Sequence, residues 1–196
     1  MRPPAAFVER CLPNLEQRAQ QPGTVGQGHG LGVQHTTGLS LKAVSDLNPQ
    51  RLDQARQDFP HVKIYETSEA FSRDKDVDVV IVATPPDTHA SVCLQMMETG
   101  KHVVCEKPLT LTWREANAMV EMAEKQHVHL SCHQNRRWDA DFLAIKQAVS
   151  EGLIGDLFYL ETFVGGFAHP CGYWHSHAAV CGGTCYDWGA HYLDWV

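Results

Sequence analysis

The strongest local chemical signal is the tripeptide Glu106-Lys107-Pro108, which directly follows the apolar run HVVC. A lysine at the carboxyl end of a parallel strand places its ammonium group in the crevice where open α/β sheets bind ligands. The proline after it stiffens the backbone and could hold a cis peptide. We therefore predict a ligand contact for Lys107, against the alternative of an ordinary solvated lysine.

A second signal is the pair Asp187 and His191 in GGTCYDWGAHYLD. A spacing of four residues puts a carboxylate and an imidazole on one face of a helix. Such a carboxylate can orient the imidazole and raise the basicity of a histidine that acts as a general base. The spacing predicts an acid-base pair, and the alternative is an ion pair on a helix surface.

Glycines cluster in GTVGQGHGLG (23–32), where Gly26 and Gly28 are candidate contacts to a dinucleotide pyrophosphate. No register of this cluster gives the full G-x-G-x-x-G pattern, and the preceding RAQQP does not read as a strand. Only residues 33–41 separate the cluster from the next strand, whereas a parallel crossover needs about a dozen residues or more. We therefore expect the first strand and its helix not to be present together, and a flexible glycine-rich loop is the alternative reading.

Two further positions fit a nucleotide crevice. Asp46 ends the strand-like run LKAVSD (41–46), where an acid can accept hydrogen bonds from ribose hydroxyls and repel a 2'-phosphate. This favours NAD over NADP, unless Asp46 is only a solvated turn residue. Thr84-Pro85-Pro86 follows DVVIVA (78–83) and either contacts the cofactor or simply ends the strand.

The elements that must position these residues follow an alternation of short β-branched runs and longer amphipathic runs, which is typical of a parallel sheet with helical crossovers. Strands are expected at 41–46, 78–83, 102–106 and 127–133, and helices at 48–57, 87–99, 112–126 and 139–151. The predicted fold class is α/β. A Rossmann-type domain with a degraded first strand spans 41–137, after an atypical segment 1–40. Residues 138–196 begin an incomplete α+β substrate domain, with strand propensity at 156–164 and a helical pattern in DWGAHYLDWV.

Composition excludes several classes of protein. The chain has 196 residues, 43% of them hydrophobic, with a formal net charge of −7, and its apolar runs are shorter than the roughly 20 residues that cross a bilayer. Neither a membrane nor a nucleic acid is an expected partner. The N-terminus has no signal-like apolar core, and the seven cysteines read as reduced thiols, so a cytoplasmic location is expected.

A competing metal-binding constellation lies near the carboxyl end of the chain. It comprises His169, Cys171, His175, His177, Cys181, Cys185 and His191. These side chains include enough soft ligands for zinc, but no Cys-x-x-Cys pair is present. We expect hydrogen-bonding and packing roles for them and predict no metal. Trp174, Trp188 and Trp195 read as core or sugar-stacking residues.

The ordered series VVIVATPPDTH, HVVCEKP, HQNRRWD and GGTCYDWGAHYLD, within residues 41–196, resembles the glucose-fructose oxidoreductase and inositol dehydrogenase family (Gfo/Idh/MocA). The resemblance implies a catalytic set of Lys107, Asp187 and His191. It also implies cofactor contacts at Asp46, Thr84, Pro85, His89, Glu106 and Lys107, and substrate contacts at Lys107, Asn135, Arg136, Asp187 and His191. The implied cofactor is NAD, with NADP possible.

The resemblance further implies the reaction, which is hydride transfer between the nicotinamide and a hydroxyl-bearing carbon of a sugar or cyclitol. His191 would act as base, Lys107 would stabilise the oxygen and Asp187 would orient the site. Relatives of this kind are expected to be homo-oligomers. The sequence departs from the family in its glycine pattern and in the missing large antiparallel sheet after Asp187 and His191, so the chain by itself is expected to be inactive and not to bind NADH. The alternatives are a non-catalytic nucleotide- or sugar-binding regulatory relative and a zinc-binding module.

Overall fold

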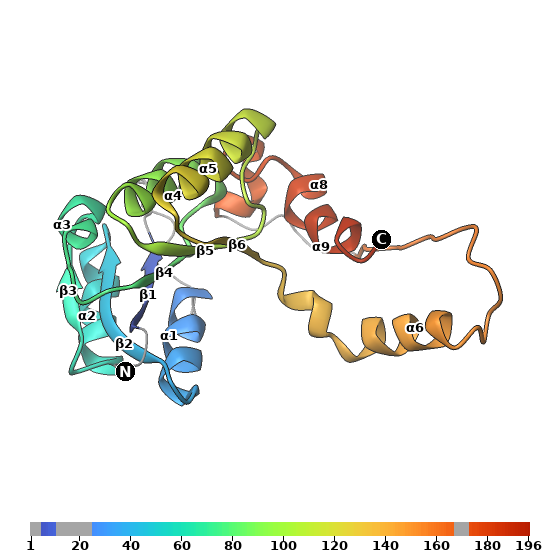
Figure 1. Ribbon diagram of the computed structural model, residues 1–196, viewed down its shortest axis with the longest axis horizontal. Helices are drawn as coiled ribbons and strands as arrows, with labels where there is room; N and C mark the ends of the chain where they lie inside the picture. Colours follow the sequence, from blue (N-terminus) through green and yellow to red (C-terminus); the bar gives the residue numbers. More distant parts are fainter. Residues whose placement is uncertain (1–4, 11–24, 167–172) are drawn as a thin grey trace.

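The computed structural model describes residues 5–10, 25–166 and 173–196 (Figure 1). Its centre is a six-stranded sheet in the order β3-β2-β1-β4-β5-β6, in which every neighbouring pair is parallel. This is the strand order of doubly wound dinucleotide-binding domains, in which the order reverses between the first and fourth strands. The predicted α/β, Rossmann-type fold class is confirmed.

The strands are β1 Ala5–Arg10, β2 Ser40–Asp46, β3 Lys63–Tyr65, β4 Val79–Val82, β5 His102–Glu106 and β6 Leu130–His133. Four of them match predicted strands. The strand β6 begins later than expected because His127 ends the preceding helix in a left-handed conformation, with φ of 55°. The strand β3 was not predicted, because its three residues are too few to show a periodic pattern.

The expectation that the first strand and its helix are not both present is wrong. The strand β1 lies in the middle of the sheet and pairs with both β2 and β4, with Arg10 in register with Asp46. From Val25 onward the glycine cluster is not a loop but part of helix α1 (Val25–His35). Gly30 lets this helix approach its neighbours, since a Cβ there would lie 2.6 Å from the ring of Phe59. Gly30 therefore serves helix packing, whereas a Cβ at Gly28 or Gly32 would meet open space.

Helices cover both faces of the sheet (Figure 1). The helices α1 and α2 (Pro49–Asp58) pack on one face, while α3 (Ser68–Ser72), α4 (His89–Glu98) and α5 (Trp113–Gln126) pack on the other. As predicted, the Asn48 side chain caps α2, and Thr112 and Glu115 form a capping box on α5. The main core fills the α4–α5 face with Val80, Val82, Val103, Cys105, Cys93, Met96, Met97 and Met119. None of the described helices is long and apolar enough to cross a membrane.

After β6 the chain leaves the sheet through a short 3-10 turn, Asn135–Trp138, and helix α6 (Ala140–Ser150), which is followed by Gly152 in a left-handed conformation with φ of 69°. The predicted strand at 156–164 is not formed. This segment is extended but pairs with no described strand, and Phe158 is 98% exposed. Strand propensity alone does not make a stable strand without a partner to hydrogen-bond, and the segment lies away from the sheet in Figure 1.

The chain then returns to the carboxyl edge of the sheet through a 3-10 turn, Trp174–Ser176, and three short helices. These are α7 (Ala178–Cys181), α8 (Thr184–Asp187) and α9 (Gly189–Leu193). The predicted terminal helix is therefore present in two pieces, which meet at Trp188. Arg137 holds this segment through two 2.6 Å bonds to Asp194, and the Trp195 indole donates to the Arg136 carbonyl at 3.2 Å.

Candidate active site

Lys107 and Asp187 meet at the carboxyl edge of the sheet. Lys107 follows the last residue of β5, and a cis peptide joins it to Pro108. Its Nζ donates to Asp187 Oδ1 at 2.6 Å and to the Asp187 carbonyl at 2.9 Å. Both side chains are largely buried. The structure thus brings together two predicted catalytic residues that lie 80 positions apart.

The Asp187 carboxylate has a second partner that sequence analysis missed. Its Oδ2 lies 2.7 Å from Nδ1 of His175, which had been grouped with possible zinc ligands. Burial raises the pKa of Asp187, but the hydrogen bonds from His175 and Lys107 outweigh it and lower this pKa to about 2. Asp187 is therefore ionised at neutral pH and fixes both neighbours.

His191 lies on α9 and is only 6% exposed. Burial lowers its pKa, the positive charges of Lys107 and Arg136 lower it further, and the smaller effects of Glu106 and Asp187 do not compensate. As expected, the charge of Asp187 raises this pKa, but its oxygens bind Lys107 and His175, and the net shift is downward. Within the described residues, His191 Nδ1 has no hydrogen-bond partner. The site thus holds a neutral imidazole with an unused ring nitrogen.

Glu106 lies beside this set, at the end of β5. The register of β5 and β6 pairs Glu106 with His133, and His133 Nδ1 lies 2.9 Å from Oε1. His29 on α1 approaches the same oxygen at 2.7 Å, and Oε2 accepts the Lys107 amide at 3.2 Å. Burial raises the pKa of Glu106, but the two histidines lower it to about 2. Its hydrogen bond to Glu106 raises the pKa of His133. Sequence analysis missed both histidines, which only the strand register and α1 could have revealed.

His89 is fully buried and ties two loops of the site together. Its Nδ1 lies 2.8 Å from the Pro108 carbonyl and its Nε2 lies 2.8 Å from the Thr84 carbonyl. Burial lowers its pKa. Because the ring has no exposed surface, a direct cofactor contact does not fit the geometry. His89 instead positions the ends of β4 and β5.

The remaining predicted cofactor residues surround the β1/β4 switch point, the usual ligand crevice of such sheets. Asp46 ends β2 and accepts the Asn48 amide at 2.8 Å, and Thr84 and Pro85 follow β4. Gly26 is buried in the first turn of α1, where backbone amides can bind an anion. The hydroxyl of Ser45 is buried without a partner among the described atoms. This donor and acceptor set fits a dinucleotide, while residues 11–24 before α1 lie outside the described residues.

The predicted substrate residues follow β6 in the 3-10 turn. The guanidinium of Arg136 lies 5.3 Å from the centre of the Trp188 ring and donates to Asp139 at 2.9 Å, whereas Asn135 is exposed. Trp188 in turn packs edge-on against His191, with ring centres 6.3 Å apart. Arg136 and Trp188 therefore form a wall beside the His191 imidazole.

The other two tryptophans make aromatic stacks. Trp174 stacks on His175 with ring centres 3.6 Å apart, and Trp195 stacks on Phe142 at 4.8 Å. Both side chains are half-buried. Trp174 therefore backs the histidine that holds Asp187, while Trp195 joins the end of the chain to α6.

The predicted zinc constellation does not assemble as one group within the described residues. His169 and Cys171 lie outside them. Cys181 donates to the His175 carbonyl at 3.3 Å, while His177 and Cys185 are exposed. The described cysteines, which are Cys93, Cys105, Cys132, Cys181 and Cys185, are free thiols. His175 and His191 belong to the surroundings of Lys107 and Asp187 instead.

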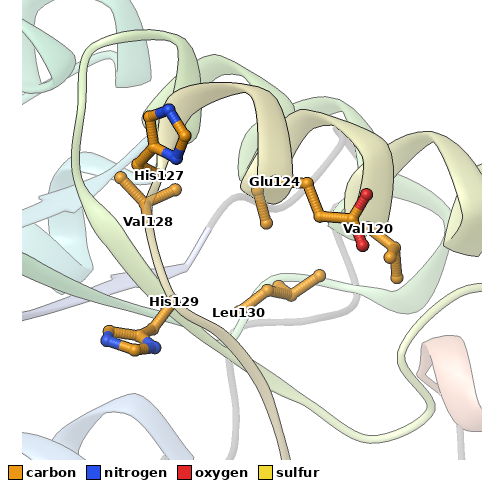
Figure 2. Close-up of a pocket in the computed structure, with 7 residues that line it drawn as sticks. Val120, Glu124, His127, Val128, His129 and Leu130 are labelled. Carbon is orange, nitrogen blue, oxygen red and sulfur yellow. The ribbon is translucent and has the colours of Figure 1, made fainter.

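A hollow of about 570 Å³ lies between α5 and the start of β6 (Figure 2). It is lined by Val120, Ala123, Glu124, His127, Val128, His129 and Leu130. These residues stand at the amino end of β6, whereas Glu106 and His133 stand at the carboxyl ends of their strands. None of the predicted site residues lines it, so we assign it no part in the chemistry.

Residues 22–134 match the sequence profile described as "Oxidoreductase family, NAD-binding Rossmann fold". The chain belongs to the Gfo/Idh/MocA family. Over 176 residues (88% of this chain) it is 33% identical to the scyllo-inositol 2-dehydrogenase (NADP(+)) IolW of Bacillus subtilis, covering 49% of that protein. Over 133 residues (68% of this chain) it is 32% identical to the myo-inositol 2-dehydrogenase of Thermotoga maritima, covering 40% of that protein.

Solved structures of this family agree with the fold. The crystal structure of an NAD-binding protein from Listeria innocua matches 98% of this chain with a TM-score of 0.86 and 35% identity, and the match covers 53% of that protein. The chain thus spans about half the length of these Gfo/Idh/MocA relatives.

Proposed function

We propose that this Gfo/Idh/MocA protein transfers a hydride between a nicotinamide dinucleotide and a hydroxyl-bearing carbon of a sugar or cyclitol. The observation that carries the proposal is the 2.6 Å contact between Lys107 and Asp187, with the buried His191 on the adjoining helix. Two relatives named as inositol dehydrogenases support a cyclitol as the substrate class.

His191 is the proposed general base. Its lowered pKa keeps the imidazole neutral at neutral pH, so that a ring nitrogen can accept the hydroxyl proton. Removal of the hydroxyl proton leaves developing negative charge on the substrate oxygen. A bound nicotinamide supplies the carbon that accepts the hydride from the substrate carbon.

Lys107 is the proposed partner of that oxygen. Its ammonium group is already oriented by two Asp187 oxygens, so little reorganisation is needed when charge develops beside it. Asp187 acts through Lys107 and is a positioning residue with respect to the reaction. Arg136 adds a second positive charge near His191 and, with Trp188, is proposed to contact the substrate.

Asp46 is the proposed determinant of cofactor choice. An acid at the end of β2 accepts ribose hydroxyls and repels the 2'-phosphate of NADP. We therefore propose NAD as the preferred cofactor, although IolW is named as an NADP(+) enzyme.

The test combines cofactor binding with a single-turnover assay. The chain, in excess over a panel of inositols and aldoses, is mixed with NAD, and the absorbance of NADH is followed. Lys107→Met and His191→Ala should each slow NADH formation by about 100-fold or more, the scale of an acid-base contribution, and leave NADH binding nearly unchanged. Lys146→Met, on the exposed face of α6, is the matched control and should leave both NADH formation and NADH binding unchanged.

Near wild-type rates in either site variant would contradict the assigned roles. Tight NADH binding without NADH formation from any member of the panel would favour the non-catalytic regulatory alternative instead.

A further inference from the structure

Two imidazoles and a carboxylate converge at the carboxyl edge of the sheet, outside the set of Lys107, Asp187 and His191. His29 Nε2 lies 2.7 Å and His133 Nδ1 lies 2.9 Å from the same atom, Glu106 Oε1. Their possible ligand atoms all lie within 4.8 Å of one another. The two rings meet edge to face with centres 4.7 Å apart. Within the described residues, no other group of this kind approaches so closely.

The three side chains come from three regular elements. Glu106 and His133 are paired in the register of β5 and β6, so both side chains lie on one face of the sheet. The helix α1 supplies His29, which lies 77 positions before Glu106. Because helices and strands hold side chains more accurately than loops do, this arrangement is preorganised.

The chemistry of the cluster matches a divalent transition-metal ion. Two neutral imidazoles and one ionised carboxylate are the protein ligands of zinc sites that keep a fourth position open. Metal–ligand distances of about 2.1 Å would place neighbouring ligand atoms about 3.4 Å apart in a tetrahedral site. The observed separations of 2.7 and 2.9 Å need to widen by about 0.7 and 0.5 Å respectively.

The burial of the three side chains also suits a bound metal ion. The side chains of His29 and Glu106 are each 14% exposed, while that of His133 is 37% exposed and leaves an open side. A bound ion would replace the hydrogen bonds that the two imidazoles make with Glu106 Oε1.

We propose that His29, Glu106 and His133 bind a single divalent ion of the zinc class, with a coordination position left open toward solvent. The proposal does not depend on hydride transfer and involves none of Lys107, Asp187 and His191, although Glu106 is also one of the expected cofactor contacts. Since Glu106 directly precedes Lys107, the bound ion would lie beside the proposed reaction site.

The test is metal titration of the chelator-treated chain, with a chromophoric indicator as competitor for Zn²⁺. Wild type should bind one ion. His29→Ala, His133→Ala and Glu106→Gln should each weaken binding by about tenfold or more. His35→Ala, an exposed histidine on the same helix, should bind as wild type does. Circular dichroism of each variant verifies folding, and His29→Gln retains a polar side chain should the alanine variant fail to fold.

The absorption spectrum of bound Co²⁺ identifies the ligand atoms independently. Nitrogen and oxygen ligands produce weak visible bands, whereas a cysteine ligand adds an intense charge-transfer band in the near ultraviolet. The proposal predicts visible bands without the thiolate band, and their loss in His29→Ala. Absence of stoichiometric binding, unchanged affinity in the His29 and His133 variants, or a thiolate band would each overturn it. Loss of binding in Cys181→Ser but not in His133→Ala would place the ion in the segment after residue 172 and would overturn it too.

Discussion

Lys107 Nζ lies 2.6 Å from Asp187 Oδ1, and this ion pair joins the end of β5 to helix α8 across 80 residues of sequence. The pair lies between two others, since Asp187 also binds His175 and the neighbouring Glu106 binds His29 and His133. Two ionised carboxylates, Asp187 and Glu106, thus lie near the carboxyl edge of the sheet, and basic groups hydrogen-bond to each of them.

Breaking the Lys107–Asp187 pair should destabilise the fold. In Asp187→Asn the lysine keeps a buried ammonium group without its anionic partner, so the free energy of unfolding should fall by about 1 to 3 kcal/mol. Urea denaturation measures this change. Asp53→Asn removes a carboxylate from an exposed pair with Arg56 and should cost about 0.5 kcal/mol or less. Equal losses in the two variants would contradict the importance of the buried pair.

Acid should destabilise the protein through Glu106 and Asp187. Their folded pKa values of about 2 lie below the ordinary values of 4.5 and 3.8. A depressed carboxylate pKa contributes stability that is complete above the ordinary value and is lost as pH falls toward the folded value. The free energy of unfolding should therefore decline between about pH 4.5 and 2. In Glu106→Gln the decline from urea titrations at successive pH values should be shallower, and an unchanged slope would refute the assignment.

The imidazole of His191 should titrate below the usual histidine range. Burial and the charges of Lys107 and Arg136 disfavour its protonated form. Removing one charge in Arg136→Met should therefore raise the pKa of His191, which proton NMR of the ring can follow without any catalytic assay. Arg114→Met on the exposed face of α5 should leave it unchanged. A pKa that falls in Arg136→Met would show that the electrostatic explanation has the wrong sign.

Cofactor choice should depend on the charge of Asp46. The chain should bind NADH more tightly than NADPH, and Asp46→Asn should reduce that preference by about tenfold, or 1.4 kcal/mol, while it keeps the oxygen that accepts the Asn48 amide. Calorimetric titration with both nucleotides measures the ratio. Tighter binding of NADPH by the wild-type chain would overturn the prediction, and Asp53→Asn is the neighbouring control.

The same titration tests the expectation from sequence that the chain does not bind NADH. The sequence pattern predicted a chain without NADH binding, in part because β1 seemed to be missing. The structure places β1 in the centre of the sheet, and a 3.3 Å bond from Gln134, the residue after β6, to the Ala190 carbonyl holds α9. With the sheet present, we predict nucleotide binding.

Local sequence patterns were sufficient to predict much of the fold. Caps such as Asn48 and Thr112 and the apolar runs of β4 and β5 act over a few residues, so the sequence reports them directly. The packing role of Gly30 in α1 could not be predicted, because it depends on the ring of Phe59, which is distant in sequence. The run at 156–164 has strand propensity but no described partner strand, and propensity does not supply one.

The candidate site could likewise be predicted from sequence only in part. The tripeptide that contains Lys107 and the spacing of Asp187 and His191 are visible in sequence, and family resemblance joined them. The contacts from His29, His133 and His175 depend on strand register and on returning loops. The net lowering of the His191 pKa also depends on distant residues, because burial and the charges of Lys107 and Arg136 outweigh the carboxylate four residues away, which raises it.

The most direct test of hydride transfer follows a labelled hydrogen. An inositol or aldose that reacts in the single-turnover assay is prepared with deuterium on the hydroxyl-bearing carbon, and the reduced nucleotide is analysed by mass spectrometry. The account predicts that the deuterium moves to the nicotinamide of NADH and that His191→Ala forms this product about 100-fold more slowly or worse. Deuterium that remains on the polyol or exchanges into water, with unlabelled NADH, would contradict it.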